Sequence, residues 1–495
     1  MTIVRWSNIG RASMRAACAA SIVVHCCRVA AFADTTVNCG VNPPVPTVPK
    51  SAKILAPGST TDNTSAIQLA LDGLKSGDWL VFPPGTYSIS HHLIVRSHGV
   101  TLYGQGATIH ATSPTDGAIL IQGDFVAVYG FKMEQDSTNR QSTPWSGGIS
   151  VFDDRGGGRR QVHGVIIQNN TIDNSAGAGI FLYKAEHFTV ANNTVWRSWA
   201  DGIHMTAGSM NGRVIHNTVS QTGDDMIAVV SYAGSRTPSP AAMRYSDWAA
   251  IENGLDKNIY IYGNQLSDQY WGRGISVVGG SDVTIDSNSV SRVPGGAGIY
   301  LARETAYMTF GDRNILLRKN AISQIQTAAA SYDPPHKNAA PNGTGAIEAA
   351  SEISSDELSD PIYRPAFSIT SIAIIANTVQ SARFAGIRMG AGETGASQVT
   401  NADGKSLTVT WTPGPVSDVI VQDNKFSNVN ASGVVAAYSG LDPATISCRG
   451  NYLNGTKWAS QCASTVMGAP AHAASIVGAS LQCDAQGIIS SEAAH

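Results

Sequence analysis

A short asparagine-centred pattern recurs at regular intervals through most of the chain. Its template is Val-x-Ile-x-x-Asn, then a short turn, then Gly-Ile and an alternating apolar stretch. The asparagines of the pattern are Asn170, Asn193, Asn217, Asn264, Asn288, Asn320, Asn377, Asn424 and Asn451. Where no insertion intervenes, as from Asn170 to Asn193 to Asn217, they are 23 or 24 residues apart. A fixed period of this length indicates a solenoid, in which each repeat buries its apolar face against its neighbours.

Apolar side chains alternate within each repeat, as in Val165 and Ile167 or in Ile203 and Met205. This period of two predicts strands that turn one face inward. Each buried aliphatic side chain in such a column contributes about 1.5–3 kcal/mol. The asparagines suit the tight turns, because asparagine tolerates left-handed backbone geometry, and there we expect them to stack into a ladder. We therefore predict an all-β fold, a right-handed parallel β-helix (solenoid) over residues 51–460.

A short amphipathic helix is predicted ahead of the repeats, from Thr64 to Leu74, with Ile67 and Leu71 on its apolar face. Such a helix is suited to capping the open end of the sheets, which would otherwise expose unpaired strand edges. Insertions interrupt the repeat at roughly 233–256, 326–344, 352–366 and 391–417. Because insertions in solenoids often gather on the binding face, we expect the first one to wall a cleft.

Both ends of the chain lack the repeat. Residues 1–33 combine several arginines, an apolar run and the small-residue site Ala31-Phe32-Ala33. This predicts a signal peptide, and hence a secreted or periplasmic protein; a disordered leader or a short membrane anchor is the alternative. Residues 34–50 form a proline-rich N-terminal segment, and residues 461–495 form a C-terminal cap or tail. No later stretch approaches the ~20 apolar residues that a membrane-spanning helix needs.

Four cysteines follow residue 33, namely Cys39, Cys448, Cys462 and Cys483. Their even number is consistent with disulfides in an oxidising compartment. We predict a bond between Cys448 and Cys462, because a separation of 14 residues closes a short loop. The formal net charge of −3 argues against nucleic acid as a partner. We expect a monomer that acts on a polysaccharide.

Two successive repeats place aspartates at the same point, directly before a strand. Asp201 precedes Gly202-Ile203, whereas Asp224 and Asp225 precede Met226-Ile227. Stacked strands lie about 4.8 Å apart, so these carboxylates are expected to be close neighbours. Like charges at that distance raise the pKa of one of them. Because such stacking is hard to justify by stability, we expect chemistry at this place.

Two tryptophans flank the aspartates in a second column of the repeat. The column reads Trp199, Gly223 and Trp271, and strand spacing puts the tryptophans about 10 Å apart. A groove with aromatic sides and a glycine floor suits a sugar ring, although packing between coils is the alternative. Strict alternation would turn Asp201 inward together with Ile203. The turn must therefore break the alternation if Asp201 is to reach the groove.

Three motifs resemble those of polygalacturonase-type glycoside hydrolases. They are Ala200-Asp201-Gly202-Ile203, similar to N-T-D-G-φ; Gly223-Asp224-Asp225-Met226, similar to G-D-D-C; and Gly272-Arg273-Gly274-Ile275, similar to G-H-G-φ. The motifs occur in the family's order on consecutive coils. The resemblance implies inverting hydrolysis, with Asp224 as the general acid and with Asp201 and Asp225 activating water. Glycoside cleavage needs one protonated and one ionised carboxyl, and crowded carboxylates separate their pKa values in that way.

The chain departs from the family at its sugar-gripping residues. Arg273 replaces the family histidine, and the family's R-I-K segment falls on Gly298 to Ala302, where both basic residues are missing. Polygalacturonic acid is therefore a doubtful substrate. The predicted substrate contacts are Arg273, His204, Trp199, Trp271 and Tyr300.

Two other functions remain open. Asp201, His204 and Arg273 suit a polysaccharide lyase or uronate C5-epimerase, in which a base removes the proton beside a carboxylate that arginine neutralises. A non-catalytic glycan-binding protein is the other alternative, since a solenoid does not fix function. In that case Asp201, Asp224 and Asp225 would hold a structural calcium ion. The hydrolase hypothesis needs no cofactor.

Overall fold

The computed structural model describes residues 37–56, 61–104, 106–155, 160–232, 254–307, 309–327, 341–354, 368–390, 394–400, 406–429, 434–436, 445–457 and 482–483. All of them belong to the unit Thr36–His495, which is separate from the unit Met1–Thr35. The predicted signal peptide therefore lies outside the described residues, as does most of the predicted C-terminal cap or tail. No helix among the described residues is long and apolar enough to cross a membrane.

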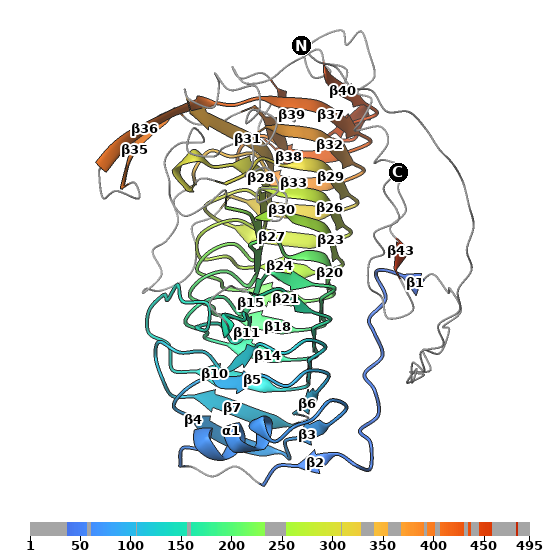
Figure 1. Ribbon diagram of the computed structural model, residues 1–495. Helices are drawn as coiled ribbons and strands as arrows, with labels where there is room; N and C mark the ends of the chain where they lie inside the picture. The colour runs from blue at the N-terminus through green and yellow to red at the C-terminus, as the bar shows by residue number, and fades with distance from the viewer. Residues whose placement is uncertain are drawn as a thin grey trace, which may run out of the picture. The chain divides into compact units, whose positions relative to one another are not determined.

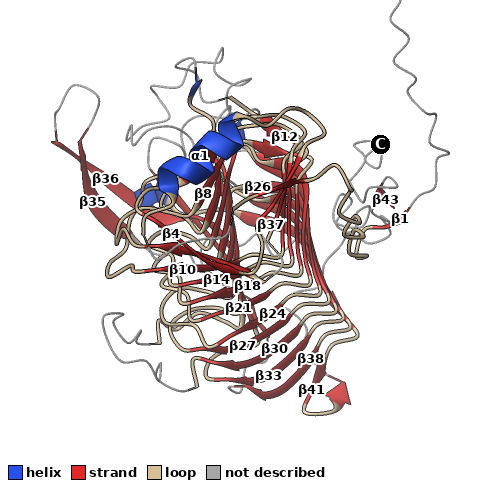
Figure 2. Cartoon of the chain, turned by 90° about the horizontal axis from the view of Figure 1, so that it is seen from below, coloured by secondary structure: helices blue, strands red, loops and turns tan. Residues whose placement is uncertain are grey.

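The chain winds in coils, and most coils give one strand to each of three sheets (Figures 1 and 2). The first sheet contains β4 (Gly85–Ile89), β7 (Ala107–Ala111), β10 (Lys132–Gln135), β14 (Thr171–Asp173), β18 (Thr194–Trp196), β21 (Thr218–Ser220), β24 (Gln265–Ser267), β27 (Ser289–Val293), β30 (Ala321–Ile325), β33 (Thr378–Ala382), β38 (Lys425–Val429), β41 (Tyr452–Leu453) and β42 (Thr456–Lys457).

The second sheet contains the strands that directly follow the predicted site residues. It contains β5 (Leu93–Val95), β8 (Ile119–Ile121), β11 (Ile149–Val151), β15 (Ile180–Tyr183), β19 (Ile203–Thr206), β22 (Ile227–Val230), β25 (Ile275–Val278), β28 (Ile299–Arg303), β31 (Ile347–Ser354), β34 (Ile387–Met389) and β39 (Val434–Ala436). The insertion predicted at 391–417 adds an antiparallel hairpin, β35 (Gly395–Thr400) and β36 (Ser406–Pro413), which pairs with the end of β31.

The third sheet completes each coil. It contains β2 (Lys53–Ile54), β3 (Trp79–Val81), β6 (Thr101–Tyr103), β9 (Ala127–Tyr129), β12 (Val162–His163), β13 (Ile166–Gln168), β16 (Ala185–Glu186), β17 (Thr189–Ala191), β20 (Met210–Ile215), β23 (Asp256–Tyr262), β26 (Gly280–Asp286), β29 (Arg313–Arg318), β32 (Ile369–Ile375), β37 (Val416–Gln422) and β40 (Ile446–Arg449). Apart from it, β1 (Val37–Asn38) pairs with β43 (Gln482–Cys483).

Adjacent coils pair in parallel and in register, so equivalent residues stack into inward columns. Ile203 pairs with Ile227 and Ile227 with Ile275, and all three side chains are fully buried. The predicted alternation of apolar residues is therefore confirmed. The predicted helix is α1 (Thr64–Asp72), which buries Ile67 and Leu71 at the N-terminal end of the stack (Figure 1).

The asparagine ladder is present, but its backbone geometry differs from the prediction. The Asn193 side-chain oxygen accepts hydrogen bonds from the backbone nitrogen of Asn170 at 2.9 Å and from its side-chain amide at 3.1 Å. The same pair of bonds links each asparagine of the repeat to the next, up to Asn451. The left-handed residue is the one before the asparagine, such as Asn169 or Asn192. The asparagine is needed for its amide, which joins successive turns, and not for an unusual φ angle.

The proline-rich segment is held against the third sheet by buried and partly buried hydrogen bonds. The guanidinium of Arg213, which is buried, donates to the carbonyls of Cys39 at 3.0 Å and Val41 at 2.7 Å. The side-chain amide of Gln168 donates to the carbonyl of Pro43 at 2.8 Å. Cys39 and Cys448 are each disulfide-bonded. Cys462 lies outside the described residues, so its bond with Cys448 stays a prediction.

A buried carboxyl at the start of β23 predicts an unusual dependence of stability on pH. Asp256 Oδ1 accepts from the backbone nitrogens of Gly208 at 2.9 Å and Ser209 at 2.6 Å. Burial raises the pKa of Asp256 to about 8. The folded chain therefore holds a proton that the unfolded chain loses above pH 4, so this residue's contribution to stability falls between about pH 4 and pH 8.

We expect Asp256→Asn to raise the melting temperature at pH 8, by about 1 °C for each kcal/mol of stability regained, and to have less effect at pH 5. The asparagine keeps the acceptor oxygen and has no proton to lose. Thermal melting of both proteins at the two pH values measures the difference. An equal shift at both pH values would contradict the assignment to Asp256.

Candidate functional site

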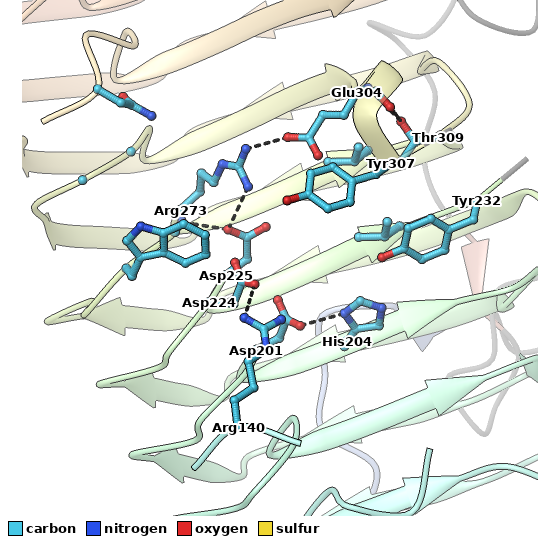
Figure 3. A pocket seen from close by; sticks show the side chains of 17 residues that line it. Arg140, Asp201, His204, Asp224, Asp225, Tyr232, Arg273, Glu304, Tyr307 and Thr309 are labelled. Atoms are coloured by element: carbon cyan, nitrogen blue, oxygen red, sulfur yellow. Dashed lines mark hydrogen bonds and ion pairs between the residues drawn. The ribbon is translucent and has the colours of Figure 1, made fainter. Parts of the chain in front are cut away.

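Most of the predicted site residues come together where the turns that follow the first sheet enter the second sheet. Asp201, Asp225 and Arg273 stand two residues before Ile203, Ile227 and Ile275, which pair in register, so they form one column on three coils. A pocket of about 550 Å³ opens there (Figure 3). Its lining is Arg140, Asp201, His204, Asp224, Asp225, Val230, Tyr232, Trp271, Gly272, Arg273, Val278, Gly295, Gly296, Glu304, Tyr307, Thr309 and Asn342.

The three aspartates converge in this pocket. One carboxylate oxygen from each of Asp201, Asp224 and Asp225 lies within 4.8 Å of those of the other two. The turn before β19 breaks the strand alternation as required, because Asp201 Oδ2 meets the Nδ1 atom of outward-facing His204 at 2.9 Å. Gly223 permits this stacking, since a Cβ atom there would lie 2.2 Å from the carbonyl oxygen of Trp199.

Asp224 and Asp201 are driven toward opposite protonation states. Burial and the charges of Asp201 and Asp225 raise the pKa of Asp224 to about 7, although the Arg140 guanidinium donates to Asp224 Oδ2 at 2.7 Å. Burial also opposes the ionised form of Asp201, but the charge and hydrogen bond of His204 outweigh it and lower the pKa of Asp201. The pocket therefore holds one carboxyl that is protonated near neutral pH beside one that is ionised.

Asp225 is fixed from two sides. Its Oδ1 atom accepts from the backbone nitrogen of Arg273 at 2.7 Å, and its Oδ2 atom accepts from the hydroxyl of Ser276 at 2.5 Å. The first contact depends on Gly272, whose left-handed φ of +99° leaves room where a Cβ atom would lie 2.9 Å from Asp225 Oδ1. These bonds hold the carboxylate in a single orientation beside Asp224.

Both arginines in the pocket are already paired with carboxylates. Arg140 contacts Asp224, while Arg273 donates to Glu304 Oε1 at 2.6 Å and lies 3.7 Å from Asp225 Oδ1. The Arg273 guanidinium also lies over the ring of Tyr300, 4.3 Å from its centroid. The positive charge of the site is thus largely balanced within the protein.

The comparisons with known proteins identify the fold. Residues 88–237 match the family model described as a right handed beta helix region. The fold is a right-handed parallel β-helix. The A-module of mannuronan C-5 epimerase AlgE6 from Azotobacter vinelandii matches with a TM-score of 0.52 and 14% identity, over 80% of this chain and 96% of that one. No curated protein matched the sequence.

Structures of GH87 α-1,3-glucanase catalytic domains also match this β-helix. The catalytic domain of a GH87 α-1,3-glucanase in complex with nigerose has a TM-score of 0.53 and 15% identity, over 83% of this chain and 70% of that one. Two GH87 α-1,3-glucanase variants, in which one or the other of two adjacent aspartates is replaced by alanine, hold tetrasaccharides. Each has a TM-score of 0.51 and 14% identity, over the same shares.

Not every predicted contact residue lines the pocket of the β-helix. Trp271 does, with 49% of its surface exposed. Trp199 does not line it, and its indole nitrogen donates to Asn174 Oδ1 at 3.1 Å. Tyr300 is also absent from the lining and lies against Arg273. Of the two predicted tryptophans, Trp271 therefore lines this pocket, whereas Trp199 and Tyr300 lie outside its lining, so their contact with a substrate stays a prediction.

The sequence pattern missed the pocket residues that lie outside the repeat. Arg140 comes from the loop between β10 and β11, Tyr232 follows β22, and Glu304 and Tyr307 follow β28. For two lining residues the sequence did hold a signal, namely their position beside or within a predicted insertion. Tyr232 directly precedes the insertion at 233–256, and Asn342 lies in the one at 326–344. Most of the first insertion lies outside the described residues, so its predicted wall of the cleft stays a prediction.

Asp201, Asp224 and Asp225 are also the pocket residues best placed to hold a cation. A calcium ion needs six to eight oxygen ligands, so water or substrate would have to supply several. Such an ion would compete with Arg140, whose guanidinium already contacts Asp224. The second group of potential metal ligands, His163, Glu186 and His187, lies outside this pocket.

Proposed function

We propose that the chain is a polysaccharide-acting enzyme, a glycoside hydrolase in which Asp224 is the general acid and Asp201 and Asp225 hold the attacking water. One observation carries the proposal, namely that neighbouring carboxyls in one pocket have pKa values shifted in opposite directions. Such a pair supplies the proton donor and the ionised carboxylate that glycoside cleavage requires.

Structural neighbours support a glycan as the substrate. A mannuronan epimerase and α-1,3-glucanases share the fold, and replacement of either of two adjacent aspartates accompanies bound tetrasaccharides in the glucanase variants. This chain also has two adjacent aspartates in its pocket, Asp224 and Asp225. The resemblance in sequence to polygalacturonase-type hydrolases points to the same pair.

The stereochemical part of the proposal is inversion. The three carboxylates approach within 4.8 Å, closer than the ~6.5–9.5 Å typical of two carboxyls that flank a water in inverting enzymes. Inversion here requires the attacking water to lie beside Asp224 and to be held in place by Asp201 and Asp225 together. The anomer released first, observed by NMR, tests this part, and retention of configuration would show that one aspartate acts as a nucleophile.

We expect a neutral glycan to be hydrolysed faster than a polyuronate. A uronate carboxylate would have to compete with Asp224, Asp225 and Glu304 for Arg140 and Arg273. The measurement is the rate of reducing-end release on matched neutral glucans and polygalacturonate, with wild type and with Arg273→Ala. Arg273→Ala should weaken binding of an acidic glycan and change turnover of a neutral one little. Preferred cleavage of polygalacturonate, lost in Arg273→Ala, would contradict this expectation.

The second candidate function is a lyase or uronate epimerase. The observation that favours it is the buried pair of His204 and Asp201 beside two arginines. Although burial opposes its charge, Asp201 raises the pKa of His204, so its imidazole is protonated more readily than usual. A protonated imidazole is a poor base, which is why hydrolysis is preferred. An ultraviolet-absorbing unsaturated product would identify a lyase, and epimerised sugar without new reducing ends would identify an epimerase.

A further inference from the structure

A second cluster of polar side chains lies at a bend of the chain that shortly precedes strands of the third sheet. On four successive coils the residue before the bend is His98, Asp124, His163 or Glu186, and His163 pairs in register with Glu186. The bend residue has a left-handed φ angle on each coil, +54° at His187 and +54° at Asn211 on the next coil. The bend therefore places His187 beside Glu186 at a position where later coils carry asparagine, aspartate or serine.

The side chains of this bend gather three donor atoms of a metal-ligand set. His163 Nδ1 lies 3.0 Å from Glu186 Oε2, and His187 Nε2 lies 4.0 Å from Glu186 Oε1. One ligand atom from each of the three residues lies within 4.8 Å of the other two. Asn211 Nδ2 donates to Glu186 Oε1 at 3.2 Å, which fixes the carboxylate from the next coil. The histidine side chains are 39% and 40% exposed, so an ion can reach them from solvent.

Glu186 differs from Asp124, the other carboxylate of this column, in the residues that pair with it. Asp124 in the same column pairs with the Arg160 guanidinium at 2.9 Å. Glu186 pairs with no lysine or arginine among the residues that the structure describes, and its ionic partners there are His163 and His187. Two imidazole nitrogens beside a carboxylate can share a cation with it.

We propose that His163, Glu186 and His187 bind one divalent transition-metal ion of the zinc class, with water in the open position. Two imidazole nitrogens and a carboxylate oxygen form a common three-ligand set for zinc. Zinc lies about 2.0–2.2 Å from its nitrogen and oxygen ligands, which puts the ligand atoms of a tetrahedral site about 3.3–3.6 Å from one another. Side-chain rotations that move these atoms by roughly 1 Å would therefore close the site. The ion joins two neighbouring coils, and Asn211 supplies the outer hydrogen bond that such ligands usually have.

The proposal is tested by titrating chelator-treated, full-length protein with Zn²⁺ in a calorimeter, and with Co²⁺ while its visible absorption is followed. We expect one ion per chain and a tetrahedral Co²⁺ spectrum. His187→Asn should weaken binding by more than the ~10–100-fold typical of losing an outer partner, and Asn211→Gly should weaken it within that range. His187→Asn puts in the residue that Asn211 and Asn258 already provide at this left-handed position, so folding should be preserved.

Matched variants separate this site from the catalytic pocket. His98→Gln removes a histidine from the same column, where it pairs with Asp124 at 3.1 Å, and should leave the affinity unchanged. The double variant Asp201→Asn with Asp224→Asn should also keep its ion, which makes the test independent of the hydrolase proposal. No binding by the wild type, unchanged binding in both His187→Asn and His163→Gln, or loss of the ion in the aspartate variant alone would each overturn the proposal.

Discussion

Asp224→Asn is expected to lower turnover of the glycan substrate by about 10²–10⁴-fold, the range usual for loss of general acid catalysis. Asparagine keeps the shape of the side chain and its contact with Arg140 but has no proton to donate at neutral pH. The measurement is kcat from reducing-end release on the best substrate of the panel. Folding should be unaffected, because the change removes one of three crowded carboxyls.

The pH profile gives this prediction a second readout. Because the pKa of Asp224 is raised to about 7, the acid is protonated below that pH, and wild-type activity should decline as the pH rises through 7. The residual activity of Asp224→Asn should lack this alkaline decline. Asp282→Asn is a matched control, since Asp282 lies on β26 in the third sheet and its left-handed φ angle suits asparagine. Full activity in Asp224→Asn would rule out the hydrolase mechanism.

Asp201→Asn is expected to cause a loss of similar size, about 10²–10⁴-fold, because the ionised carboxylate that activates water is removed. The change also removes the negative charge beside His204, whose Nδ1 atom meets Asp201 Oδ2 at 2.9 Å. The measurement is kcat for Asp201→Asn and for His204→Gln on the same substrate. A hydrolase should lose far more activity from Asp201→Asn than from His204→Gln, which removes only a positioning contact.

The reverse order, with His204→Gln inactive and Asp201→Asn active, would contradict water activation by Asp201 and favour the lyase or epimerase. Thermal melting supplies the remaining control. If the three aspartates hold a structural calcium ion, both aspartate variants should melt well below the wild type, and chelator should lower the wild-type melting temperature equally. Unchanged melting with large losses of turnover is the result expected for catalysis.

The sequence by itself determined the solenoid and the aspartate column. Both follow from a local period, because residues at equivalent points of successive coils must stack once the strands pair in register. Asp201, Asp225 and Arg273 could be aligned on this ground, and the apolar columns could be assigned to the core. The asparagine ladder was foreseen for the same reason, although the left-handed residue proved to be its predecessor.

Only the tertiary structure decided what surrounds the aspartates and which way their side chains turn. Arg140 reaches Asp224 across 84 residues of sequence, and Glu304 reaches Arg273 from a loop outside the repeat. Loops obey no period, so their positions depend on the whole stack. The direction of Asp201 depended on the backbone of one turn, and the place of Trp199 on a hydrogen bond to Asn174. The pKa values of Asp224 and Asp201 likewise arise from burial and neighbouring charges, which exist only once the coils have stacked.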